Sequence, residues 1–315
     1  MTINPLPFVH ADDEWSPLKA VIVGRAGRSC FPSAPGPMIA ATMPAAHVHR
    51  FQPKSPFPEG LVAKAELELN QFAAILEAEG IKVYRPPSGI DWLAEDGYTG
   101  AMPRDGLMSV NNVLIEACFA WSCRALEIEI AYGPILDEGG QGRQGDSCSA
   151  AGELLRRYSA VSRHVTNQAG VDYMREKLPT GYRIEMLEVN DPSAMHIDAT
   201  ILPLRKGLLV YNPKKVTEEA LRKHEILADW KLQAYPYIPQ EREDPPLYMT
   251  SPWLCLNALV LNGEKVVVEA SDSKTARWFL SLRHCGPGQG YQVNAVFKLM
   301  RVGGDGGTLF EQGWP

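Results

Sequence analysis

The sequence predicts a single α/β domain. Short apolar runs alternate with helical stretches along all 315 residues. A strand at 18–24, a helix at 61–79 and a strand at 81–85 form one strand–helix–strand unit, and 254–270 reads as a hairpin. This order is typical of α/β proteins. Because no linker divides the chain, one compact domain over residues 1–315 is expected.

Hydrophobic periodicity predicts the first elements. Residues 18–24 form a short apolar run closed by a glycine, which indicates a buried strand. Residues 31–60 are rich in proline and predict a long loop. Apolar side chains then recur at helical spacing over 61–79, and Gly80 suits the position just after a helix. A strand at 81–85 and a strand pair at 107–110 and 112–117 follow.

Glycines and helix caps predict the second half. The glycine-rich segment 137–149 lacks the Gly-Lys-Ser/Thr ending of a phosphate loop and is expected to be a flexible connection. Thr217 predicts the start of a helix that runs to about Trp230, and Asn262-Gly263 predicts a tight hairpin turn. The other elements expected are helices at 150–160, 170–178 and 273–283, and strands at 182–189, 232–238 and 291–300.

Composition excludes several classes of protein. The 31 basic and 37 acidic residues give a net charge of -6, whereas nucleic-acid binding needs clustered Lys and Arg. The sequence has no run of 18 apolar residues, so no membrane span is expected. The N-terminus resembles no targeting segment, and a cytoplasmic protein is therefore expected. No Gly-x-Gly-x-x-Gly opens a helix and no cysteine pair suits a metal, so neither a bound dinucleotide nor a metal is expected.

The most informative stretch is 191–213. His196 and Asp198 lie two residues apart at the start of an apolar run, and in an extended segment both would share one face. On spacing alone, an edge-strand histidine beside a solvated aspartate explains the pair equally simply. Similarly, Asp105 follows Arg104 in a Pro-Arg-Asp turn, which could be a surface ion pair of little energetic weight.

Taken together, motifs along the chain resemble the amidinotransferases of the arginine:glycine and inosamine-phosphate type. They are collinear over roughly residues 14–280. In chain order they are Glu14-Trp-Ser-Pro-Leu, Val21-Ile-Val-Gly-Arg25, Arg85-Pro-Pro, Ile90-Asp-Trp92, Ala101-Met-Pro-Arg-Asp105, Ile115-Glu-Ala117, Ala120-Trp121, Val165-Thr-Asn167, Asp191-Pro-Ser-Ala-Met-His-Ile-Asp-Ala-Thr200, Asn212-Pro213, Met249-Thr-Ser-Pro-Trp-Leu254 and Asn257.

This resemblance implies a fold and a chemistry. The fold is a pseudo-fivefold α/β propeller of ββαβ modules around a central channel, the pentein type. The chemistry is transfer of the amidino group of arginine to a small amine. A cysteine thiolate attacks the guanidino carbon, ornithine leaves, and the acceptor amine then takes the group from the amidino-cysteine. No cofactor is implied. The resemblance allows a homodimer, although the sequence leaves the oligomeric state open.

The resemblance also implies roles for individual residues. Asp105 and Asp198 match the carboxylates that hold the guanidinium, and His196 matches the general acid and base. Met195 and Ser251 match residues that line the substrate site. Lys215 stands where the family usually has an arginine for the substrate carboxylate, so the charge is kept and the bidentate fork is lost.

Two segments, near 137–149 and 284–315, depart from the family pattern. The C-terminal glycine-rich motif lacks its cysteine, and the nearest His-Cys pair is His284-Cys285. The nucleophile is therefore either Cys285 or absent. In the other segment, the carboxylate that orients the histidine is either Asp146 or, in a different alignment, replaced by Ser149.

Three functions remain open from the sequence. The first is an active amidinotransferase with a small, glycine-like acceptor, in creatine-type metabolism or, favoured by the missing targeting segment, in specialised-metabolite biosynthesis. The second is a pseudoenzyme that binds guanidino ligands without turnover. The third is a hydrolase that passes the group to water. A transferase would release ornithine from arginine. A pseudoenzyme would bind arginine without a covalent adduct, and a hydrolase would release citrulline.

Overall fold

The computed structural model describes residues 9–31, 53–117, 119, 122–138, 159–160, 168–190, 197–238, 256–269, 272–282 and 295–299. The strands among these residues form five small sheets, each of two or three strands. No helix in these ranges combines the length and the apolar character needed to cross a membrane.

The first sheet is the strand–helix–strand unit that the sequence predicts. β1(Ala20–Ile22) pairs in parallel with β2(Lys82–Tyr84), and α2(Glu59–Ala78) connects them. Gly80, with a φ of 77°, follows the helix in the left-handed conformation that glycine adopts without strain. The helix α2 begins two residues earlier than the apolar spacing suggested, just after Pro58, and both strands are shorter than the apolar runs that predicted them.

The next two sheets also have two strands each. The single-turn helix α3(Pro103–Gly106) leads into the antiparallel pair β3(Leu107–Val110) and β4(Val113–Glu116). The chain continues through η2(Ser122–Arg124), the π-helix η3(Ile128–Tyr132) and α4(Gly133–Glu138). Beyond these, β5(Ser159–Ala160) pairs in parallel with β6(Met186–Leu187), and α5(Gln168–Lys177) lies between them in sequence.

The last two sheets share one ββαβ order. In the first, β7(Ile201–Arg205) and β8(Leu208–Tyr211) form a hairpin, α6(Glu218–Arg222) follows, and β9(Lys231–Ala234) pairs in parallel with β8. In the second, β10(Leu259–Asn262) and β11(Lys265–Glu269) form the hairpin, α7(Ser273–Ser281) follows, and β12(Ala295–Leu299) pairs in parallel with β11.

Several expected elements are wrong in extent. Residues 159–160 form a strand rather than a helix end, and 137–138 belong to α4 rather than to a flexible connection. The strand expected at 182–189 contracts to β6. The hairpin turn consists of Gly263 and Glu264, because Asn262 pairs with Lys265 in the ladder. The Asn262 side chain stabilises this turn by accepting hydrogen bonds from the backbone amides of Glu264 and Lys265, both at 2.9 Å.

The helix expected from Thr217 to Trp230 is also shorter, although its cap is confirmed. Thr217 Oγ1 accepts a hydrogen bond of 3.1 Å from the Ala220 amide, which satisfies one donor of the first turn. The helix ends at Arg222 because the chain folds back as the 3-10 turn η5(Glu225–Leu227). The Arg222 guanidinium holds this return by donating to the carbonyls of Leu227, Ala228 and Trp230.

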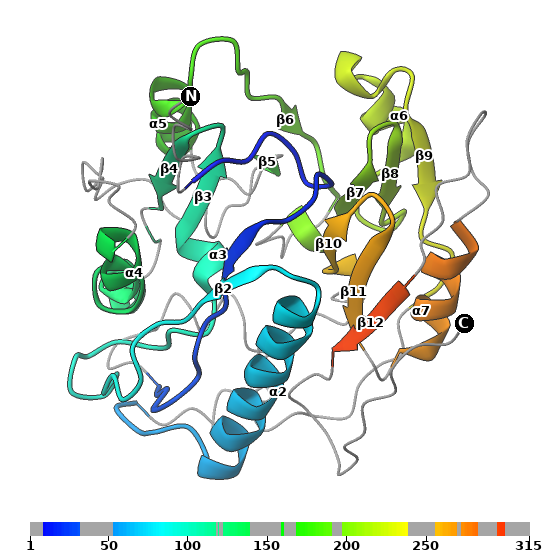
Figure 1. Ribbon diagram of the computed structural model, residues 1–315. Helices are drawn as coiled ribbons and strands as arrows, with labels where there is room; N and C mark the ends of the chain where they lie inside the picture. The colour runs from blue at the N-terminus through cyan, green and yellow to red at the C-terminus, as the bar shows by residue number, and fades with distance from the viewer. Residues whose placement is uncertain are drawn as a thin grey trace, which may run out of the picture.

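The first and last sheets close on each other. In Figure 1 the sheets follow one another around the molecule in chain order, and α2 lies beside β12. Leu76 of α2 and Val23 share a buried core with Leu261 and Val267 of the last sheet. The Leu18 amide also donates to the Leu261 carbonyl at 2.8 Å. Residues more than 180 positions apart in sequence therefore pack together around the first sheet.

Candidate functional site

Asp105 is placed by the short helix α3. Pro103 occupies the first turn, where its missing N–H costs nothing. The Asp105 amide donates to the Met102 carbonyl at 3.1 Å and closes the turn. The Asp105 residue is 7% exposed, so its carboxylate is in the interior and not on a loop edge. The surface ion pair that the sequence left open as an explanation is therefore wrong for this residue.

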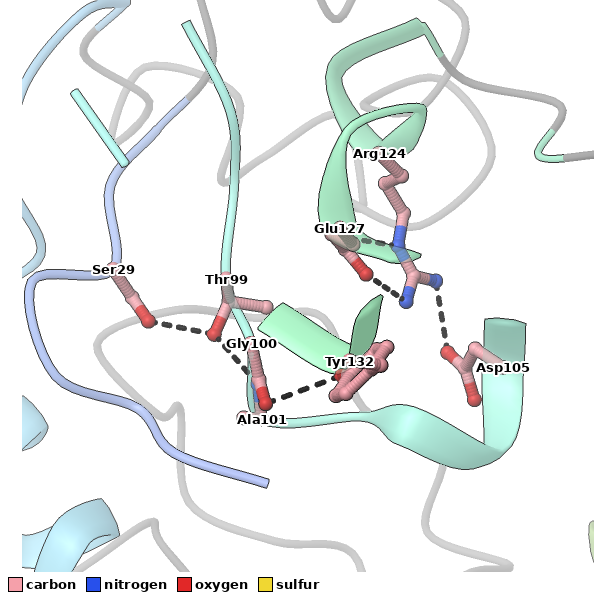
Figure 2. A network of polar contacts seen from close by, with 8 residues as sticks. All are labelled: Ser29, Thr99, Gly100, Ala101, Asp105, Arg124, Glu127 and Tyr132. Carbon is pink, nitrogen blue, oxygen red and sulfur yellow. Dashed lines mark hydrogen bonds and ion pairs between the residues drawn. The ribbon is translucent and has the colours of Figure 1, made fainter. Parts of the chain in front are cut away.

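Arg124 binds Asp105 inside the protein. Its Nη1 donates to Asp105 Oδ2 at 2.8 Å, while Nε and Nη2 donate to the two carboxylate oxygens of Glu127 at 2.9 and 2.8 Å. Figure 2 shows the guanidinium between the two carboxylates. Arg124 is 2% exposed and Glu127 is fully buried. Bidentate pairing with Glu127 fixes the plane of the guanidinium, which in turn fixes where it meets Asp105.

The local electrostatics favour a compact, cation-centred cluster. The Phe119 ring lies 4.5 Å from the Arg124 guanidinium carbon and covers one of its faces. Burial raises the pKa of Glu127 above its usual range, and the Arg124 guanidinium opposes this shift. With all three groups ionised, Asp105, Arg124 and Glu127 together carry one net negative charge.

A second polar chain supports the segment that enters α3. Tyr132 donates to the Gly100 carbonyl at 3.2 Å, and the hydroxyls of Ser29 and Thr99 are 2.6 Å apart (Figure 2). The Ala101 amide donates to Thr99 Oγ1 at 3.2 Å. A Cβ on Gly24, at the end of the first strand region, would overlap the carbonyls of Gly100 and Ala101. Close backbone packing therefore sets the path of the chain into α3.

Asp198 lies in a 3-10 turn and not in an extended segment, which was the condition for sharing one face with His196. In η4(Ile197–Ala199) the Thr200 amide donates to the Ile197 carbonyl at 2.7 Å, and β7 begins only at Ile201. Asp198 is 5% exposed. The buried Asn212 side chain holds this turn by donating to the Ala199 carbonyl at 3.2 Å. The Asn-Pro motif thus supports the Asp198 turn from the far end of the hairpin.

The other predicted site residues differ in how far they are placed. Lys215 follows β8, its amide donates to the Asn212 carbonyl at 3.1 Å, and it is partly exposed. Six of them lie outside the described residues: Met195, His196, Ser251, Cys285, Asp146 and Ser149.

Arg124 and Glu127 were missed by sequence reasoning. Their spacing of three places both on one helical face, which is the signal that could have revealed the pair. Nothing in the spacing, however, indicates that the pair is buried or that it contacts Asp105, which is 19 residues earlier in the chain.

The two free cysteines among the described residues, Cys30 and Cys123, do not have the surroundings of a nucleophile. Burial raises the pKa of each thiol to about 11, so the thiolate is scarce near neutral pH. A pocket of about 190 Å³ lined by Arg25, Glu66, Trp92 and Gly100 among others contains none of the predicted site residues.

Comparisons with known proteins give a consistent set of relatives. No protein-family model matches the chain. The chain is 31% identical to the mitochondrial glycine amidinotransferase of Danio rerio over 333 residues, covering 87% of this chain and 76% of the relative. It is 32% identical to the L-arginine:L-lysine amidinotransferase of Pseudomonas savastanoi pv. phaseolicola over 308 residues, covering 82% of each.

Solved structures extend these similarities to the fold. SxtG, an amidinotransferase of saxitoxin biosynthesis from Microseira wollei, matches with a TM-score of 0.70 and 29% identity over 86% of this chain and 88% of that one. The inosamine-phosphate amidinotransferase StrB1 of Streptomyces griseus matches with a TM-score of 0.71 and 24% identity over 93% and 91%. A dimethylarginine dimethylaminohydrolase, at 15% identity and a TM-score of 0.53 over 90% and 92%, shares the fold alone.

Proposed function

The chain belongs to the amidinotransferase family, and we propose that it transfers the amidino group of L-arginine to a small, glycine-like amine and releases ornithine. The observation that carries the proposal is the interior position of Asp105, backed by a buried Arg124–Glu127 pair, on a chain about 30% identical to amidinotransferases over most of its length. Asp198, buried in a separate turn, supplies a second carboxylate of the same kind.

Carboxylates suit the substrate for a physical reason. A guanidinium is planar and cationic, and its delocalised charge makes its carbon a weak electrophile. Carboxylates that accept paired, charge-assisted hydrogen bonds orient that plane. In the proposed reaction, Asp105 and Asp198 hold the guanidinium while the Cys285 thiolate forms a bond to its carbon. The bond from that carbon to the departing nitrogen then breaks, and ornithine leaves after that nitrogen gains a proton.

The remaining roles belong to residues that carry the family resemblance. His196 gives the proton to the departing amine and later removes one from the acceptor, with Asp146 holding the imidazole. Lys215 attracts the substrate carboxylate as a point charge, without the planar fork of an arginine. Met195 and Ser251 line the substrate.

We also propose that the chain is one domain folded as a pseudo-fivefold propeller of ββαβ modules. The part of the chain that the structure describes has five separate sheets, two of them in complete ββαβ order, and these support the arrangement. The core shared by the first and last sheets supports a closed rather than an open array. A cytoplasmic location and a homodimer stay predictions.

The relatives suggest more than one kind of acceptor and pathway. The names of the matched proteins specify glycine, lysine and an inosamine phosphate, and one of them acts in saxitoxin biosynthesis. A role in specialised-metabolite biosynthesis is therefore part of the proposal, with acceptor identity to be measured.

Whether Cys285 acts as a nucleophile distinguishes this function from that of a pseudoenzyme that only binds guanidino ligands. Among the described residues, the observation that favours the second function is the burial of Cys30 and Cys123, which raises the pKa of each thiol to about 11 and leaves little thiolate near neutral pH. Intact-mass analysis after incubation with arginine alone separates the two. We expect one amidino adduct on the peptide that contains Cys285, and none in Cys285→Ser. Binding of arginine without an adduct would establish the pseudoenzyme.

A further inference from the structure

The carboxylate of Asp105 accepts a hydrogen bond from Arg124, and the orientation of Arg124 is in turn fixed by Glu127. Arg124 uses one nitrogen for Asp105 Oδ2, at 2.8 Å, and its other two for Glu127. All three residues are at most 7% exposed. Because water is excluded, neither carboxylate has bulk solvent with which to exchange its hydrogen bonds, and the relative orientation of the three groups is set by the protein.

From this arrangement we infer that Arg124 and Glu127 are positioning residues for Asp105 in amidino transfer. The inference rests on the proposed function, in which Asp105 holds the guanidinium of arginine. Glu127 fixes the guanidinium plane of Arg124 with two parallel bonds, and Arg124 then fixes the rotation of the Asp105 carboxylate. Neither residue touches the substrate in this role.

Packing around Arg124 gives the cluster little room to adjust. The Phe119 ring covers the guanidinium, and a Cβ on Gly106 would lie 2.9 Å from the same ring. The Thr99 amide also bonds to the Glu127 carboxylate, which links this carboxylate to the segment that enters α3. A lysine at 124 keeps the charge but has no fork, so it cannot satisfy both carboxylates in the same geometry.

The net charge of Asp105, Arg124 and Glu127 also suits the binding of a guanidinium. With one guanidinium and two carboxylates ionised, the cluster has a net negative charge in a low-dielectric region. A second guanidinium, that of arginine, would bring the set to neutrality. Glu127 thus contributes charge as well as geometry, and Glu127→Gln removes the charge together with one of the two acceptors for Arg124.

A double-mutant cycle on the full-length chain tests the inference. Wild type, Arg124→Lys, Asp105→Asn and the double variant are compared by kcat/KM for arginine, measured as ornithine release. We expect Arg124→Lys to lower kcat/KM by about 10- to 100-fold. In the Asp105→Asn background the same change should have an effect of less than about three-fold, because Arg124 then has no carboxylate to position. Losses that multiply in the double variant would overturn the inference.

A control separates positioning from general ion-pair loss. Arg175 and Asp172 form an ion pair of the same length, 2.8 Å, but with side chains 49% and 60% exposed. Arg175→Lys should leave kcat/KM unchanged. Glu127→Gln should lower it in the same direction as Arg124→Lys, measured well below the melting temperature of each variant because loss of a buried ion-pair partner destabilises the fold.

A second readout does not depend on turnover. The side-chain carboxyl ¹³C signal of Asp105, identified by its loss in Asp105→Asn, should shift in Arg124→Lys and in Glu127→Gln. An unshifted signal overturns the inference whatever the activity. If wild type neither releases ornithine nor binds arginine, the proposed function is wrong, and a shifted Asp105 signal would then retain Arg124 and Glu127 as its positioning residues.

Discussion

The hydroxyl of Thr200 is buried beside the turn that carries Asp198 and makes no hydrogen bond with any residue the structure describes. A buried hydroxyl without a partner costs free energy, and valine has nearly the same shape. Thr200→Val should therefore raise the free energy of unfolding by about 1 kcal/mol, measured by urea denaturation. A loss of similar size would mean that the hydroxyl has a partner in the folded protein.

Glu68 gives stability a dependence on pH. Burial, and next the nearby Glu269 charge, raise the pKa of Glu68 from 4.5 to about 8. The folded state thus holds a proton that the unfolded state releases. Its stabilising effect is complete below pH 4.5 and is lost as pH rises through about 8.

Substitution of Glu68 tests this dependence. In wild type, Glu68 should lower the free energy of unfolding by roughly 1–2 kcal/mol as pH rises from about 5 to 8, after allowance for solvent screening. This decrease should be absent in Glu68→Gln. The exposed Glu95→Gln serves as the control for loss of one carboxylate. Equal slopes in Glu68→Gln and wild type would contradict the assignment.

At the scale of elements, the helix α3 depends on a glycine. A Cβ at Gly106 would lie 2.9 Å from Phe119 Cζ and 3.1 Å from Ile128 Cγ1. Gly106→Ala should destabilise the protein by about 1–3 kcal/mol and weaken arginine binding, because the displaced ring also covers Arg124. Gly60→Ala in α2, with nothing within 4 Å, is the matched control and should be neutral or slightly stabilising.

Elements with a local cause were predictable. The unit β1–α2–β2 follows from apolar periodicity and from Gly80, which has a positive φ. The end of α6 was not predictable, because it depends on Arg222 binding carbonyls beyond the helix. The turn at Asp198 was equally hidden, since the Asn212 amide that supports it comes from the far side of a hairpin.

The candidate site shows the same division between local and distant causes. Motifs of short range place Asp105 and Asp198 in the family pattern, and the comparisons confirm the family. The contact of Arg124 with Asp105 needs the fold, because 19 residues and two strands separate them. Sequence reasoning found the carboxylates and missed the residues that hold one of them.

For the whole molecule, closure of the first sheet on the last is testable. Leu76 is fully buried in the core that contains Leu261 and Val267. Leu76→Ala should cost about 2–5 kcal/mol and lower hydrogen-exchange protection in both β1 and β10. Leu67→Ala on the same helix, where the side chain is 47% exposed, should change neither. Loss of protection in β1 alone would contradict a shared core.

The proposed activity of the whole molecule is transfer of an amidino group from arginine to an amine. The most direct test is to incubate the purified protein with L-arginine and a panel of small amines, glycine first, and to quantify ornithine. The proposal predicts ornithine and an equal amount of a guanidino product, both lost in Asp105→Asn. No ornithine at any pH between about 6 and 9 would contradict it, and citrulline in place of a guanidino product would identify a hydrolase.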